Sequence, residues 1–116
     1  MKIGVPKEIK QGENRVAITP DIVGKLIKKG FQVYVEQSAG VKAGFLDQKY
    51  LEAGAEIKPD PKELYNNSEI VLKVQRPLFN SDLDMNELDM IKPNTLLISL
   101  SYSLHYPQVV KAAAEK

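Results

Sequence analysis

Short apolar runs alternate with segments of helical spacing along most of the chain. The runs are rich in β-branched residues and predict strands; they are KIGVP (2–6), FQVYVE (31–36), IVLKV (70–74) and TLLISL (95–100). A shorter run, AEIK (55–58), predicts a further strand. Strands separated by helical segments predict an α/β fold with an open, mainly parallel sheet flanked by helices, in flavodoxin-like or Rossmann-like layers.

Residues that start and stop helices bound two of the intervening segments. Thr19 is predicted as the N-cap of a helix that has Pro20 at its first position and ends at Gly30. Asp47 is predicted to cap a second, shorter helix that ends at Gly54. Both helices connect consecutive predicted strands, as βαβ units require.

The later connections are less regular. KELYNN (62–67) predicts a helical turn, and residues 77–90 form a connection with weak helical spacing. A last helix is expected from Pro107 onward. Because a βαβ pattern would normally continue into another strand, we expect the domain to be incomplete at its C-terminus.

Composition limits the possible functions. The 116 residues are enough for one ordinary domain, and 43% are hydrophobic, which predicts a folded core. A formal net charge of +1 gives no broad attraction for nucleic acid or an anionic membrane. The sequence has no cysteine, hence no disulfide, thiolate metal site or thiol nucleophile, and no apolar run approaches the roughly 18 residues of a membrane span.

Familiar ligand motifs are missing. No G-x-G-x-x-G follows a predicted strand and no Walker phosphate loop occurs, so no cofactor-binding residue is predicted here. The single histidine, His105, has no partners at metal-ligand spacing and is interpreted as a helix-start or surface residue. The serines of SYS (101–103) are interpreted as helix caps. The acidic segment DLDMNELD (82–89) lacks calcium-loop spacing and is interpreted as a solvated face.

Two cations are the candidate site residues. Lys73 lies in an otherwise apolar strand that Pro77 ends, so it is expected near the carboxyl end, where ligands of open α/β sheets bind. Arg15 follows the loop after the first strand and is expected at the same edge. Together they could hold a small carboxylate, the arginine as a fork and the lysine as a point charge. The alternative is that both are solvated residues in surface salt bridges.

Three segments carry a resemblance to a known family. MKIGVPKEIKQGENRVAITP (1–20), VYVEQSAG (33–40) and IVLKVQRP (70–77) resemble the N-terminal domain shared by alanine dehydrogenase and the alpha subunit of NAD(P) transhydrogenase. The resemblance covers nearly the whole chain. It implies two α/β domains with a cleft between them, residues 1–116 forming the N-terminal one. An NAD-binding Rossmann domain is expected downstream, which would account for the missing glycine motif.

The resemblance also bears on the branch of the family. In alanine dehydrogenases an arginine and a lysine that match Arg15 and Lys73 hold pyruvate, and a catalytic histidine follows the strand that matches TLLISL. Here Ser101 and Tyr102 stand in that place, and the nearest histidine is His105. KVQRP (73–77) in place of a KVKEP-type sequence is likewise similar to transhydrogenases. The resemblance therefore implies the first part of a transhydrogenase alpha subunit, and no catalytic residue is predicted in this chain.

Membership of that branch implies a complex of several subunits. NAD(H) would bind the second domain and NADP(H) a partner beta subunit, with hydride transfer coupled to proton movement through a membrane part. The alpha subunit is expected to be a homodimer in the cytoplasm, peripheral to the bacterial inner membrane. The fragment alone is expected to be inactive and to hold no cofactor. Two alternatives stay open: an alanine dehydrogenase-like enzyme that uses Arg15 and Lys73, and a non-catalytic association module.

Overall fold

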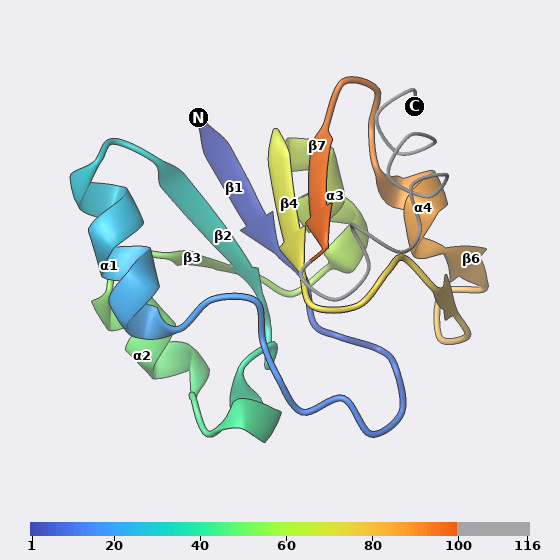
Figure 1. Cartoon of the computed structure of the whole chain (residues 1–116), viewed down its shortest axis with the longest axis horizontal. Helices are drawn as coiled ribbons and strands as arrows, with labels where there is room; N and C mark the ends of the chain where they lie inside the picture. Colours follow the sequence, from blue (N-terminus) through green and yellow to red (C-terminus); the bar gives the residue numbers. More distant parts are fainter. Residues whose placement is uncertain (100–116) are drawn as a thin grey trace.

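The computed structural model describes residues 1–99 of the chain (Figure 1). Within that range a five-stranded sheet forms the centre of the molecule, and every neighbouring pair of its strands is parallel. The predicted parallel α/β fold is thus confirmed. The helix expected from Pro107, the caps expected in 101–103 and His105 lie outside the described residues.

The sheet has the strand order β3-β2-β1-β4-β7. Its strands are β1 (Lys2–Val5), β2 (Gln32–Glu36), β3 (Glu56–Lys58), β4 (Ile70–Lys73) and β7 (Leu96–Ser99). Counted along the chain, this is the order 3-2-1-4-5 of the Rossmann fold. The chain adds strands on one side of β1 and then crosses to the other side. The switch point of the sheet therefore lies between the carboxyl ends of β1 and β4.

Helices cover the two faces of the sheet separately. On one face, α1 (Pro20–Lys28) and α2 (Asp47–Glu52) enclose a core that includes Val5, Val23 and Val35. On the other face, α3 (Pro61–Asn67) and the short α4 (Glu87–Met90) contribute Leu64 and Met90 to a second core that includes Val71 and Leu97 of the sheet. A 3-10 turn, η1 (Val41–Ala43), lies between β2 and α2. The result is the layered arrangement that right-handed βαβ crossovers produce.

Most of the predicted helix boundaries are confirmed, and one is wrong. The Thr19 side chain accepts a hydrogen bond from the Ile22 backbone at 3.4 Å, and Gly30 takes a positive φ of 96° just past the end of α1. The prediction that Asp47 caps α2 (Asp47–Glu52) is wrong, because the capping position is Leu46 and Asp47 is the first helical residue. Asp47 Oδ1 instead accepts a hydrogen bond from the backbone N–H of Ser38, at an N···O distance of 2.8 Å.

The connection between β4 and β7 is more structured than its sequence predicts. A small antiparallel pair, β5 (Phe79–Asn80) and β6 (Met85–Asn86), leads into α4. The interpretation of residues 82–89 as a solvated acidic face is wrong for Glu87, which is buried, whereas the other three acids of the segment are exposed. Glu87 turns inward because it is the first residue of α4, where its carboxylate meets a buried lysine.

Candidate functional site

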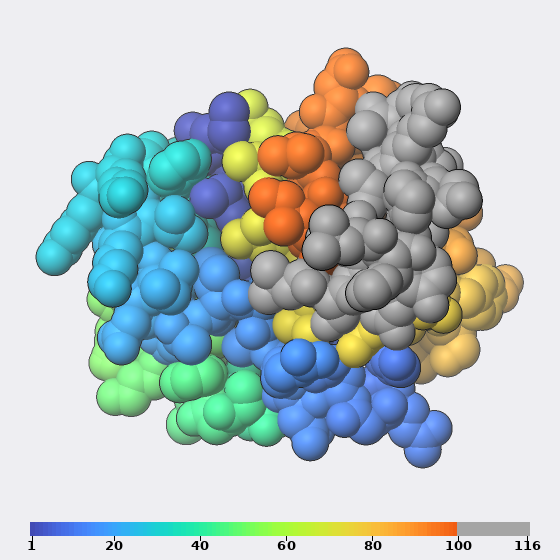
Figure 2. All heavy atoms as spheres, viewed as in Figure 1, coloured from blue at the N-terminus to red at the C-terminus, as the bar shows by residue number. Residues whose placement is uncertain are grey.

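Polar residues from two loops meet at the carboxyl edge of the sheet. The loop after β1 carries Glu8, Glu13 and Arg15, and the segment after β4 carries Gln75. Figure 2 shows these two segments, blue and yellow, side by side on the surface. Because this edge includes the switch point between β1 and β4, it is the place where open α/β sheets bind ligands.

Lys73 is buried here and pairs with two carboxylates. Its side chain is only 1% exposed, and its Nζ donates to Glu8 Oε1 at 3.1 Å and to Glu87 Oε2 at 3.3 Å. Glu8 also accepts from the backbone N–H groups of Val74 and Gln75, at 2.9 and 3.2 Å. A buried charge persists only when it is paired and hydrogen-bonded in this way. Lys73 thus ties the β1 loop and α4 to the end of β4.

Glu87, like Glu8, has three hydrogen-bond donors around its buried carboxylate. It accepts hydrogen bonds from the Leu78 backbone at 2.9 Å and from the Tyr65 hydroxyl at 3.1 Å, in addition to the Lys73 ammonium. Burial raises the pKa of Glu87, although Lys73 acts in the opposite direction. Burial also raises the pKa of Tyr65 well above its usual range, so the phenol stays a hydrogen-bond donor.

Arg15 lies at the surface and is held by Glu13. Its Nε and Nη2 donate to Glu13 Oε2 and Oε1, both at 2.9 Å, and its backbone N–H donates to Oε2 at 2.9 Å. The Arg15 side chain is 66% exposed and that of Glu13 only 5%. The Arg15 hydrogen bond lowers the pKa of Glu13 to about 2, and Glu13 raises the pKa of Arg15. Both groups therefore stay charged throughout the neutral range.

Gln75 completes this second cluster. Its Nε2 donates to Glu13 Oε1 at 2.6 Å, and the residue is 6% exposed. A carboxylate oxygen only accepts, so the amide nitrogen must face Glu13 and the amide oxygen must point elsewhere. That oxygen, Oε1, is buried and has no hydrogen-bond partner among residues 1–99. It is an acceptor that a donor from a ligand, from water or from more of the polypeptide can satisfy.

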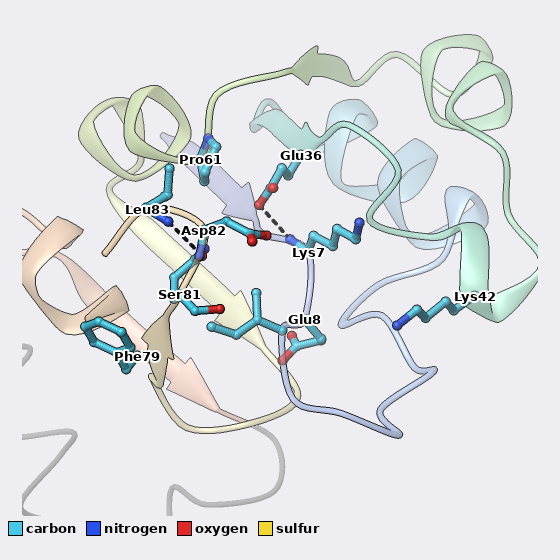
Figure 3. Close-up of a pocket in the computed structure, with 11 residues that line it drawn as sticks. Lys7, Glu8, Glu36, Lys42, Pro61, Phe79, Ser81, Asp82 and Leu83 are labelled. Atoms are coloured by element: carbon cyan, nitrogen blue, oxygen red, sulfur yellow. Dashed lines mark hydrogen bonds between the residues drawn. The ribbon is translucent and has the colours of Figure 1, made fainter. Parts of the chain in front are cut away.

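A cavity of about 400 Å³ lies next to these clusters. Figure 3 shows Lys7 and Glu36 on one wall and residues of the β5–β6 hairpin, including Phe79 and Ser81, on the other. Glu36 accepts a hydrogen bond from the Lys7 backbone at 2.9 Å, and burial raises its pKa to about 7. A much smaller hollow beside Arg15 shares Lys7 with this cavity. The edge thus carries cations and a carboxyl group that titrates near neutrality.

The structure places the two predicted site residues at the same edge but in different clusters. Lys73 is buried between Glu8 and Glu87, whereas Arg15 is exposed and pairs with Glu13. Their joint binding of a carboxylate stays a prediction, because Lys73 would have to give up an ion pair to reach one. Arg15 uses two of its five guanidinium N–H donors and is exposed, whereas Lys73 uses two of its three and is buried, so Arg15 is the cation that a ligand can reach.

Sequence reasoning missed the acids and the amide that organise these clusters. Glu8 and Glu13 stand in a polar loop, where nothing distinguishes them from solvated acids, and Glu87 stands in an acidic run. The available signal was the buried-strand lysine itself, which requires carboxylate partners. Gln75 follows Lys73 by two residues, so it could have been assigned to the same edge.

The described residues do not form a dinucleotide cradle. Such a cradle needs a tight glycine turn that leads directly from the first strand into a helix. Here β1 ends at Val5 and α1 begins only at Pro20, and between them Gly12 occurs in a turn that opens no helix. Residues 1–99 also contain no cluster of histidines or acids arranged to hold a metal ion. In the same range, no helix has both the length and the apolar character to cross a membrane.

The strand order defines a Rossmann-like α/β domain, and the ion pairs of Arg15 and Lys73 mark a polar site at its switch point. The chain belongs to the family described as "Alanine dehydrogenase/PNT, N-terminal domain", which residues 4–116 match. The resemblance drawn from the sequence is thus confirmed at the level of the family.

Relatives from both branches are about equally similar. The chain is 40% identical over 116 residues to an alanine dehydrogenase of Methanococcus maripaludis. It is also 40% identical over 116 residues to a Rickettsia prowazekii protein named as the first part of NAD(P) transhydrogenase subunit alpha. Both matches cover the whole of this chain but only 30% of each relative. A solved L-alanine dehydrogenase superposes with a TM-score of 0.77 at 33% identity, over 97% of this chain and 29% of that one.

Proposed function

We propose that the chain is the N-terminal part of the alpha subunit of a proton-translocating NAD(P) transhydrogenase, which moves hydride between NAD(H) and NADP(H). The similarity over the whole chain to a transhydrogenase subunit alpha supports this assignment. So does KVQRP (73–77), whose glutamine stands beside Arg15 in the folded chain. In this role residues 1–116 supply one wall of a cleft, and the NAD domain lies downstream.

One observation favours the transhydrogenase branch. The cluster of Arg15, Glu13 and Gln75, in which only Arg15 is exposed, has permanent charges and an uncharged amide: the pKa of Glu13 is about 2 and that of Arg15 is raised. Amino-acid dehydrogenation needs a general acid or base with a pKa near the working pH. Hydride transfer between two nicotinamides needs positioned cofactors and exclusion of water. Glu36 has a pKa of about 7, but it accepts a hydrogen bond from the Lys7 backbone and none from the residues of this cluster.

The two predicted site residues then have different roles. Lys73 keeps the cleft wall in shape, because its ion pairs join the β1 loop, β4 and α4. Arg15 offers its remaining N–H donors to an anionic group of the approaching cofactor, as arginine forks do for phosphate and carboxylate. Lys7 and Lys42, at the neighbouring cavity, extend the positive edge.

The remaining assignments follow from the same proposal. NAD(H) binds the downstream domain of the full-length subunit, and NADP(H) binds the partner beta subunit. A membrane part couples hydride transfer to proton movement. The alpha subunit forms a homodimer on the cytoplasmic side, peripheral to the bacterial inner membrane. The isolated chain has no activity.

An alanine dehydrogenase-like enzyme is the second candidate. It is favoured by the equal similarity to the Methanococcus maripaludis enzyme and by the free donors of Arg15, which suit the carboxylate of a keto acid. In that case the acid or base that exchanges the proton lies outside residues 1–99. A non-catalytic association module is the third candidate.

Two activities of the full-length protein, assayed with its membrane partner, separate these candidates. We expect NADPH-dependent reduction of an NAD⁺ analogue, and no NADH formation from L-alanine and NAD⁺. Alanine-dependent NADH formation that Arg15→Ala abolishes would establish the second candidate instead. Absence of both activities, in a protein that is folded and associates with a partner, would favour the module.

A further inference from the structure

A single carboxylate oxygen connects Gln75 to Arg15. Glu13 Oε1 accepts from Gln75 Nε2 at 2.6 Å and from Arg15 Nη2 at 2.9 Å. Glu13 Oε2 accepts from Arg15 Nε and from the Arg15 backbone N–H. Each oxygen of this buried carboxylate thus takes two donors, and three of the four come from Arg15. Two donors on one oxygen lie within about 6 Å of each other, so the amide and the guanidinium are neighbours.

A backbone turn brings Glu13 to the position where it contacts Arg15 and Gln75. The Glu13 N–H donates to the Lys10 carbonyl at 3.0 Å and closes a four-residue turn, in which Gly12 has a φ of 84°. A positive φ at the third residue of such a turn favours glycine. After the turn, Glu13 and Arg15 are two residues apart, which in extended backbone puts both side chains on the same side.

We propose that Glu13 and Gln75 are positioning residues for Arg15. Gln75, fixed at the end of β4, holds the Glu13 carboxylate, and Glu13 holds two N–H groups on one side of the guanidinium. The opposite side, with its remaining donors, faces outward in one orientation. This inference rests on the proposed function only for the identity of what Arg15 meets, and not for the positioning itself.

The physical benefit is preorganisation. A loop arginine that is 66% exposed would otherwise populate many rotamers and lose that freedom on binding. Two parallel N–H···O bonds to a buried carboxylate remove the freedom beforehand, which leaves more of the interaction energy for the ligand. A carboxylate that only neutralised Arg15 would act in the opposite direction, because removing it would strengthen binding of an anion.

The first experiment measures Arg15 directly. The chain has two arginines, Arg15 and Arg76, so its NMR spectrum contains two Nε–H signals. We expect the Arg15 Nε–H to exchange with water about tenfold more slowly than that of free arginine. Gln75→Ala and Glu13→Gln should remove most of this protection, while the backbone spectrum shows that both variants are folded. Glu63→Gln, which removes an exposed partner of Lys58, is the control and should change nothing at Arg15.

Two results would overturn the inference. One is an Arg15 signal that exchanges as fast as free arginine in the unsubstituted chain. The other is full protection in Gln75→Ala, which would show that Gln75 does not hold Glu13. Protection should persist from pH 7 to pH 4, because the pKa of Glu13 is about 2, and be lost as the carboxylate protonates at lower pH.

A second measurement separates this inference from the proposed function. In the full-length enzyme, Glu13→Gln and Gln75→Ala should each lower the rate of hydride transfer, and Arg15→Ala should lower it most. If Arg15→Ala leaves the rate unchanged while the NMR result holds, the positioning stands and the proposed use of Arg15 fails. If Glu13→Gln raises the affinity for the cofactor, Glu13 is a neutralising partner and the inference fails.

Discussion

At the scale of single residues, the edge contains two clusters of opposite character. The cluster around Lys73 is closed, since its ammonium and both carboxylates are buried and hydrogen-bonded to one another and to the backbone. The cluster around Arg15 is open, with a buried carboxylate and an exposed guanidinium. A closed cluster maintains shape, while an open one can meet a ligand. This difference supports our proposal of separate roles for two cations that the sequence presents as a pair.

The closed cluster predicts a large loss of stability for Lys73→Ala. The substitution leaves the carboxylates of Glu8 and Glu87 buried without a counter-ion, which typically costs about 3–5 kcal/mol. Lys49→Ala is the matched control, because its ion pair with Glu52 is exposed and is worth less than about 1 kcal/mol. Urea denaturation at pH 7 measures the loss in free energy of unfolding for both variants. Equal effects of the two substitutions would mean that Lys73 does not hold the edge together.

Glu36 predicts a pH dependence of stability. Burial raises its pKa from 4.5 to about 7, so the folded state holds a proton that the unfolded state releases between those values. The contribution of Glu36 to stability therefore falls as pH rises from about 4.5 to 7 and is constant above that window. Glu36→Gln keeps the acceptor for the Lys7 backbone but cannot ionise. Relative to the unsubstituted chain, the variant should gain stability between pH 5 and pH 8; a constant difference would contradict the raised pKa.

At the scale of elements, the strands and their helices are the predictable part. Apolar runs predict four of the five strands of the sheet, because the strands of a parallel sheet pack against helices. The short β3, with the sequence EIK, is predicted from its place before two prolines and not from an apolar run. The clusters are less predictable because their contacts span long separations: Lys73 meets Glu8 65 residues away. Nothing in the local sequence identifies Glu8, Glu13 or Glu87 as buried acids. The fold therefore follows from pattern, whereas the site requires the folded chain.

The packing of α3 on β1 predicts opposite effects for one substitution at two glycines. A Cβ on Gly4 would collide with the side chain of Ser68, whose hydroxyl is bonded to the Leu64 carbonyl. Gly4→Ala should therefore destabilise the fold by about 1–3 kcal/mol or more. A Cβ on Gly24, in α1, meets nothing within 4 Å, so Gly24→Ala should stabilise by up to about 1 kcal/mol. Thermal unfolding distinguishes the two, and a neutral Gly4→Ala would disprove the close approach.

At the scale of the whole molecule, residues 1–99 form a Rossmann-like sheet without a dinucleotide cradle. The strand order is that of a nucleotide-binding fold, but the long connection from β1 to α1 carries an arginine site where a phosphate turn would stand. The family membership and the 30% coverage of longer relatives agree with a domain that works with another. These observations agree with our proposal that the cofactor binds a downstream domain and that this domain forms a wall of the cleft.

Titration with NADH shows where the nucleotide binds. The purified 116-residue chain and the full-length subunit are each titrated, and nicotinamide fluorescence and heat are followed. We predict no measurable binding to the chain, because its weak positive edge is screened by salt and no backbone cradle among the described residues holds a pyrophosphate. We predict saturable binding to the full-length subunit. Saturable binding to the 116-residue chain with a micromolar constant would contradict this assignment and place a nucleotide site within these residues.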